Sequence, residues 1–270
     1  PLPLTKPTIS SLMKTKKMTR VSFSAESRSL DVSLPKSWPE LSPAELQAVF
    51  QVIAKYPPED VPLRVFRALT GMRVLRSCGD DFICRFSPAN TKKPVALRIR
   101  PEELAELLRP LEFLFSPGAV PVRIPEVDGC KAVDALLHGV SFSDYIRLES
   151  LFQGFLSTRS PEAFAELVGI LYPGAVRFDQ AETVCIMNWM VQLKAAFSEA
   201  FPNFFRPVSG EVDAPSMLDV INNEIRALTG GDVEKEPAIL ASDCWRALTE
   251  LDFKAKEAEE HKRFMARNGR

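Results

Sequence analysis

The sequence predicts an α+β protein, with helices and a small antiparallel sheet near the N-terminus followed by an all-α helical bundle. Three short segments between residues 72 and 100 alternate apolar and polar side chains and are separated by turn residues, which is typical of strands. Beyond residue 140 the apolar residues recur every three or four positions, which is typical of helices. A chain of 270 residues, 46% of them hydrophobic, can bury a core without disulfides or a metal ion.

The distribution of charge and the positions of proline and glycine divide the chain into parts. Residues 1–20 hold five basic and no acidic side chains, whereas residues 111–270 hold 16 basic and 24 acidic ones. Prolines and glycines cluster in residues 116–141, which indicates loops. The predicted organisation is a disordered leader at 1–17, an α+β domain at 18–115, a linker-like loop region at 116–140, and a helical domain at 141–270 with a projecting C-terminal helix.

The first elements have clear local signals. Residues 20–24 and 30–34 alternate as a short hairpin does. Ser42, followed by Pro43 and then by Glu45, is a capping-box start for a helix that Tyr56-Pro57-Pro58 ends. A second helix is expected from about residue 59 to residue 70, ending at Gly71.

Three strands are expected next, at Met72–Ser77, Phe82–Phe86 and Val95–Arg100. Their alternation gives the sheet one apolar face and one face that carries arginines. A helix then starts at Pro101 and reaches about Leu114, with a bend or break at Pro110.

The rest of the chain is expected to be helical. The predicted helices cover 143–157, 160–172, 179–200, 215–229 and 237–265. The third is apolar around most of its circumference and should lie at the centre of the bundle. The fourth carries an apolar stripe of Leu218, Ile221, Ile225 and Leu228. The last should extend into solvent, supported by the i,i+4 pairs Glu250–Lys254, Asp252–Lys256 and Glu259–Arg263.

Residues for catalysis or metal binding are sparse. The two histidines, His138 and His261, are far apart, and the five cysteines form no C-x-x-C motif. The sequence therefore predicts a non-enzymatic protein with reduced thiols and no cofactor. The longest apolar stretch, residues 183–197, is too short and too polar to span a membrane. No apolar targeting segment follows the basic start, so a cytoplasmic location is expected.

Two groups of side chains are candidates for binding. One is a basic surface on the sheet, either a solvated face or a contact surface for nucleic acid or an acidic partner. The other is an aromatic set, either bundle core or a groove for a protein partner, because Phe204 and Phe205 lie beyond Pro202. The basic residues are Arg73, Arg85, Lys92, Lys93, Arg98 and Arg100, and the aromatic ones are Trp189, Phe197, Phe201, Phe204, Phe205 and Trp245.

Several stretches of the helical region resemble a group of phage proteins. They are GFLST at 154–158, LVGILYP at 167–173, NNEIRALTGGDVEKE at 222–236 and WRALTEL at 245–251. Residues 140–260 are similar here to poorly characterised tail-morphogenesis proteins of Bacteroidetes phages and prophages, of the tail-assembly-chaperone kind. The resemblance implies an assembly role with a tail or virion component as partner, in the bacterial cytoplasm or associated with the virion, and it carries no catalytic residues.

The leading expectation is thus a phage-derived assembly protein that binds a protein partner through its helical domain. The alternative is a nucleic-acid-associated accessory protein that uses Arg85, Arg98 and Arg100.

Overall fold

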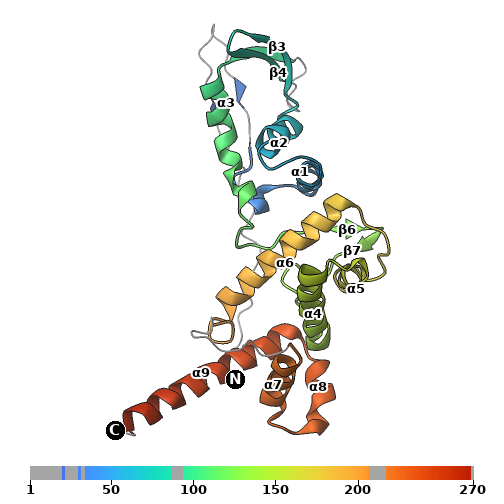
Figure 1. The fold of residues 1–270 in the computed structure, drawn as a ribbon, viewed down its shortest axis with the longest axis vertical. Helices are drawn as coiled ribbons and strands as arrows, with labels where there is room; N and C mark the ends of the chain where they lie inside the picture. The colour runs from blue at the N-terminus through green and yellow to red at the C-terminus, as the bar shows by residue number, and fades with distance from the viewer. Residues whose placement is uncertain (1–19, 22–29, 32–33, 87–93, 207–216, 269–270) are drawn as a thin grey trace, which may run out of the picture. The chain divides into compact units, whose positions relative to one another are not determined.

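A computed structural model of the protein describes residues 20–21, 30–31, 34–86, 94–206 and 217–268. The chain forms two compact units, Pro1–Ser116 and Pro117–Arg270, and each is described by itself. The predicted α+β class is confirmed, because a small antiparallel sheet accompanies a majority of helices (Figure 1).

The first unit opens with short elements at the positions that the sequence indicated. Strands β1 (Arg20–Val21) and β2 (Leu30–Asp31) pair antiparallel. A single 3-10 turn, η1 (Trp38–Glu40), leads to helix α1 (Pro43–Lys55). The predicted capping box is present, since the Glu45 amide donates to the Ser42 hydroxyl and the Ser42 amide donates to the Glu45 carboxylate.

Helix α2 (Val61–Thr70) ends at Gly71, whose φ of 65° is left-handed and therefore suits glycine. The chain then enters the sheet, whose strands β3 (Arg73–Cys78), β4 (Asp81–Phe86) and β5 (Val95–Ile99) lie in the order β3-β4-β5, all antiparallel. The buried face carries Cys84, Phe86, Leu97 and Ile99. The ring of Phe86 meets that of Phe66 on α2 edge to face, with centroids 6.3 Å apart.

The helix after the sheet changes character where a bend was expected. Helix α3 (Pro101–Leu108) gives way to the 3-10 segment η2 (Arg109–Phe115), so the break falls at Pro110 as predicted. The indole of Trp38 donates to the Ser116 carbonyl over 2.7 Å and thus ties the end of η2 to the start of the unit.

The second unit begins with the residues that were expected to be a loop region. They include a short hairpin, β6 (Glu126–Val127) with β7 (Cys130–Lys131). The segment packs onto the helices of its own unit, because Val127 and Leu137 are buried and the Tyr172 hydroxyl donates to the Ile124 carbonyl over 2.8 Å. Residues 117–140 therefore pack as part of this unit and contribute Ile124, Val127, Leu137 and Val140 to its core.

Helices α4 (Phe142–Thr158), α5 (Pro161–Leu171), α6 (Gln180–Ala200) and α7 (Met217–Thr229) follow. Helix α6 has the predicted capping box of Asp179 and Glu182 at its start. Its buried residues are spread around the helix, as expected for a central element. They are Ala181, Cys185, Ile186, Trp189, Met190, Gln192, Leu193 and Phe197.

The prediction of one continuous C-terminal helix at 237–265 is wrong. A 3-10 turn, η3 (Val233–Lys235), and a short helix, α8 (Glu236–Leu240), precede helix α9 (Cys244–Asn268). The break has a tertiary cause. The Ser242 carbonyl accepts from the Phe142 amide at 2.8 Å, the Asp243 carboxylate accepts from the Gly139 amide at 2.6 Å, and the Cys244 amide donates to the Val140 carbonyl at 2.9 Å.

Beyond Leu251, helix α9 has no buried residue among those described, and it runs out from the other helices of its unit (Figure 1). Two of its three predicted ion pairs form, Glu250–Lys254 at 3.6 Å and Glu259–Arg263 at 3.1 Å. Asp252 and Lys256 form no ion pair in the described part of the chain; Asp252 accepts hydrogen bonds from Asn203 and Phe204. Within the described ranges, no helix combines the length and apolarity that crossing a membrane requires.

Candidate functional site

A groove of about 620 Å³ lies in the second unit, among α4, α6, the turn at 201–206 and α7. Its walls are mostly aliphatic and aromatic, with four charged side chains among them. The lining residues are Tyr145, Ile146, Glu149, Gln153, Lys194, Phe204, Phe205, Arg206, Val220, Ile221 and Glu224. Its volume falls in the range of sites that take a small molecule or a few side chains of a partner.

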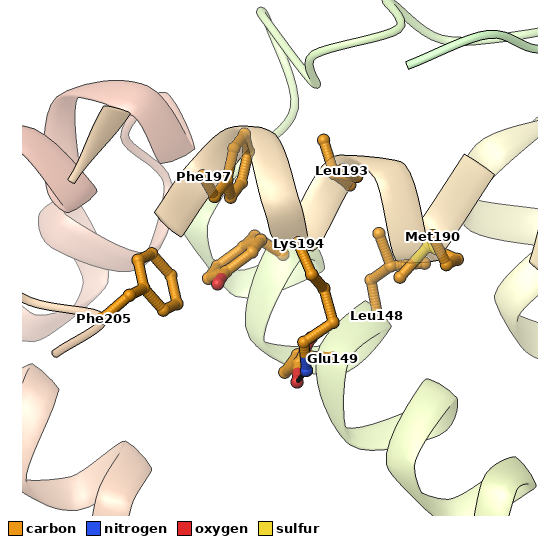
Figure 2. Close-up of a pocket in the computed structure, with 8 residues that line it drawn as sticks. Leu148, Glu149, Met190, Leu193, Lys194, Phe197 and Phe205 are labelled. Atoms are coloured by element: carbon orange, nitrogen blue, oxygen red, sulfur yellow. Dashed lines mark hydrogen bonds and ion pairs between the residues drawn. The ribbon is translucent and has the colours of Figure 1, made fainter. Parts of the chain in front are cut away.

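A separate small cavity of about 10 Å³, close to the room that a single water needs, shares the lining residues Tyr145, Glu149, Lys194 and Phe205 with the groove. Figure 2 shows Phe205 directed toward Phe197 on α6, and Lys194 reaching down to Glu149 on α4. Leu148, Met190 and Leu193 complete the apolar floor.

The Glu149 carboxylate is already engaged inside the unit. One of its oxygens pairs with the Lys194 ammonium and also accepts from the Gln153 amide at 2.9 Å. The Lys194 nitrogen lies 5.7 Å from the centroid of the Phe152 ring, at cation–π distance. The charges of Glu149 and Lys194 therefore largely neutralise one another.

Glu224 is different. Its carboxylate makes no ion pair or hydrogen bond to any residue that the structure describes, although its side chain is half-buried. Burial, with a smaller contribution from the like charge of Glu149, raises its pKa from 4.5 to about 7. This carboxyl can therefore hold a proton near neutral pH, or it can accept a cation that enters the groove.

The aromatic rim of the groove is held in place by helix α9. Asp252 accepts from the backbone amides of Asn203 and Phe204, at 2.7 and 3.0 Å, and from the Asn203 side-chain amide at 2.9 Å. Burial raises the pKa of Asp252, but these hydrogen bonds together outweigh it and leave the pKa below its usual value. The turn that carries Phe204 and Phe205 is thus fixed by a carboxylate 48 residues or more away in the chain.

The structure separates the aromatic candidates into two groups. Trp189, Phe197 and Phe201 are buried and belong to the core. Trp245 is half-buried. Its ring packs against Phe201 of the core, with centroids 5.1 Å apart, and against His138 of the loop before α4, with centroids 4.5 Å apart. Phe204 and Phe205 are the members of the set that line the groove.

The strand register places Arg73, Arg85 and Arg98 on the same face of the sheet, opposite the buried face. Arg98 pairs with Asp81 at 2.5 Å and Arg100 pairs with Glu103 at 2.8 Å, so both have carboxylates of their own unit. Arg73 and Arg85 face one another across β3 and β4, and the Arg85 Nε atom is buried without a hydrogen-bond partner. Lys92 and Lys93 lie outside the described residues.

Cysteines and possible metal ligands are scattered in the described part of the chain. No group of three or more His, Cys, Asp or Glu side chains there could hold a metal ion. All five cysteines are free, and burial raises the pKa of both Cys185 and Cys244 to about 12, so their thiols stay protonated.

Comparisons with protein-family models, with curated proteins and with solved structures found no match to this chain.

Glu149, Lys194 and Glu224 were not among the residues that the sequence indicated. One signal was present, because Glu224 sits at position i+3 of the stripe Ile221, Ile225 and Leu228, where an apolar residue is expected. The Glu149–Lys194 pair has no sequence signal, since its members are 45 positions apart and helix α5 lies between them in the chain.

Proposed function

We propose that residues 117–270 form a non-enzymatic protein-binding unit whose groove takes an apolar segment of a partner that carries a basic side chain. The observation that carries this proposal is the half-buried Glu224 carboxylate, which faces the groove without a partner in the described residues. Buried charges in proteins are normally neutralised, so this carboxyl either keeps its proton or pairs with a cation that a partner brings into the groove.

The walls of the groove support the same kind of partner. Phe204, Phe205 and Ile221 offer apolar surface to aliphatic side chains, and Glu224 offers a carboxylate beside them. A lysine or arginine flanked by apolar residues would pair with Glu224 and cover the rings at the same time.

The wider role that we propose is assembly of a phage or prophage tail. It is supported by the resemblance of residues 140–260 to tail-morphogenesis proteins. The projecting part of α9 supports it as well, because Phe253, Phe264 and Met265 are each more than half exposed there. These exposed apolar side chains are available to contact another protein.

The alternative, a nucleic-acid-associated role for the sheet face, has less support. Arg98 and Arg100 are paired with carboxylates, which reduces the positive potential available to phosphates. Loss of a salt-sensitive interaction with DNA or RNA on replacing Arg85, Arg98 and Arg100 would favour this alternative.

The test begins with the products of neighbouring genes, each co-expressed with this chain and assayed for a stable complex. Phe205→Asp and Glu224→Gln should each weaken the complex by about tenfold or more, while circular dichroism shows a retained fold. Val191→Asp, at an exposed position on α6, and Glu199→Gln, also exposed on α6, are the matched controls. Unfolding of Phe205→Asp, together with unchanged binding by Glu224→Gln, would show that the groove is only packing.

A further inference from the structure

A second hollow, of about 350 Å³, lies in the first unit between α1, α2 and the start of β3. Three arginines and one tyrosine surround an apolar floor. The lining residues are Val52, Tyr56, Arg64, Arg67, Ala68, Gly71, Met72 and Arg73. It shares no lining residue with the groove of the second unit. Of the arginines predicted on the sheet, Arg73 lines it.

Local structure explains why the three arginines converge. Arg64 and Arg67 are three residues apart in α2, so they lie on one side of that helix. Gly71 adopts a φ of 65°, which ends α2 and turns the chain back. Arg73, two residues later, begins β3 and borders the same hollow.

The charges of this cluster are not balanced within the described residues. Arg64 has a loose ion pair with Asp60 at 3.6 Å, and its guanidinium also lies 4.3 Å from the centroid of the Tyr56 ring. The guanidinium groups of Arg67 and Arg73 make no ion pair or hydrogen bond to any described side chain. Three positive charges therefore face one carboxylate.

Neighbouring groups offset little of that excess. The carbonyl end of α2 contributes a partial negative charge of about half an electron. Arg85, directly opposite Arg73 in the strand pairing, adds a further positive charge. Burial raises the pKa of the Cys84 thiol, and the positive charge of Arg67 partly opposes that rise. The Arg67 charge is therefore felt at the edge of the core. The hollow thus has a net positive charge of more than one.

We propose that this hollow binds a small phosphate-bearing molecule with at least two negative charges. Guanidinium groups donate paired hydrogen bonds to phosphate oxygens, and three of them on a shallow floor match a di- or triphosphate better than a single carboxylate. A nucleic-acid strand fits less well, because its bases would need aromatic rings to stack on. Tyr56 is the aromatic residue of the lining, and the Arg64 guanidinium already lies over its ring. This site is independent of the protein-binding groove.

Inorganic pyrophosphate is the probe, titrated calorimetrically into the full chain at low ionic strength. The proposal expects saturable binding to one site. Arg67→Gln and Arg73→Gln should each weaken it by about tenfold or more, since a hydrogen-bonded charge pair is lost. Arg76→Gln removes the same charge from an exposed position on β3 that does not line the hollow, and should change the affinity less than about twofold.

Backbone amide shifts of the unmodified protein provide a readout that does not depend on the variants folding. Residues 64–73 should respond to pyrophosphate and the amides of α9 should not. Absence of saturable binding would overturn the proposal, and so would equal weakening by Arg76→Gln. Tighter binding of a longer oligonucleotide, with a contribution from Arg76, would overturn it in favour of an extended nucleic-acid surface.

Discussion

Replacing Glu224 by glutamine should stabilise the second unit at alkaline pH while weakening its complex with a partner. The pKa of Glu224 is raised from 4.5 to about 7, so the folded state holds this proton more tightly than the unfolded state does. The stability that this group contributes is therefore fully present below pH 4.5 and is lost as the pH rises through about 7. Glutamine resembles the protonated acid in shape and has no charge to desolvate.

The magnitude follows from the two pKa values. Their difference corresponds to at most about 3 kcal/mol of unfolding free energy. The groove is open to solvent on one side, so screening reduces the expected effect to about 1–2 kcal/mol. For a unit of this size, that gain corresponds to a rise in melting temperature of roughly 2–8 °C.

Thermal unfolding of the wild type and of Glu224→Gln at about pH 4 and about pH 8.5 measures the effect. The two proteins should melt together at the lower pH, and the variant should melt higher at the upper pH. Glu199→Gln removes the same charge from the exposed surface of α6 and should shift neither transition. If Glu224→Gln gave the same melting temperature as the wild type at both values, the carboxylate would be solvated and the charge argument for the groove would fail.

Three other substitutions test the packing that positions the two sites. Asp252→Ala removes the acceptor of the Asn203 amides and should cost about 1–3 kcal/mol in chemical denaturation, with loss of the groove's binding; a cost near zero would show that this carboxylate does not hold the turn. Gly174→Ala should cost about 1–3 kcal/mol in the same assay, because φ is 98° and the added carbon would lie 3.3 Å from the Cys130 sulfur; an unchanged midpoint would refute the strain. Phe86→Ala should cost about 3–5 kcal/mol in the unfolding of the first unit, because the ring is fully buried, and a loss below about 1 kcal/mol would contradict that burial.

Local chemistry accounts for the parts of the fold that the sequence predicted correctly. Ser42 with Glu45, and Asp179 with Glu182, satisfy helix-start amides within three residues, so their effect does not depend on the rest of the chain. The strand β4 likewise shows its two faces in its own alternation, because successive side chains point to opposite sides.

The break before α9 depended on distant residues. The sequence from 237 to 265 has a continuous helical periodicity, which predicts one helix. Ser242-Asp243 within it is also a possible helix start, but the periodicity alone does not show that the helix breaks there. The structure ends α8 there because Gly139 and Phe142 donate to Asp243 and Ser242, about 100 residues away along the chain. Asp252 illustrates the same point, since it accepts from Asn203 instead of pairing with Lys256.

The sequence by itself determined the α+β class, the positions of most helices and strands, and the scarcity of residues suited to catalysis. Those properties follow from periodicity, caps and composition, which act over a few residues. Only the tertiary structure brought Glu149, Lys194 and Glu224 to one groove, and Arg64, Arg67 and Arg73 to one hollow. The physical reason is that a charge becomes unusual through its desolvation and its neighbours, and both are set by which elements pack together.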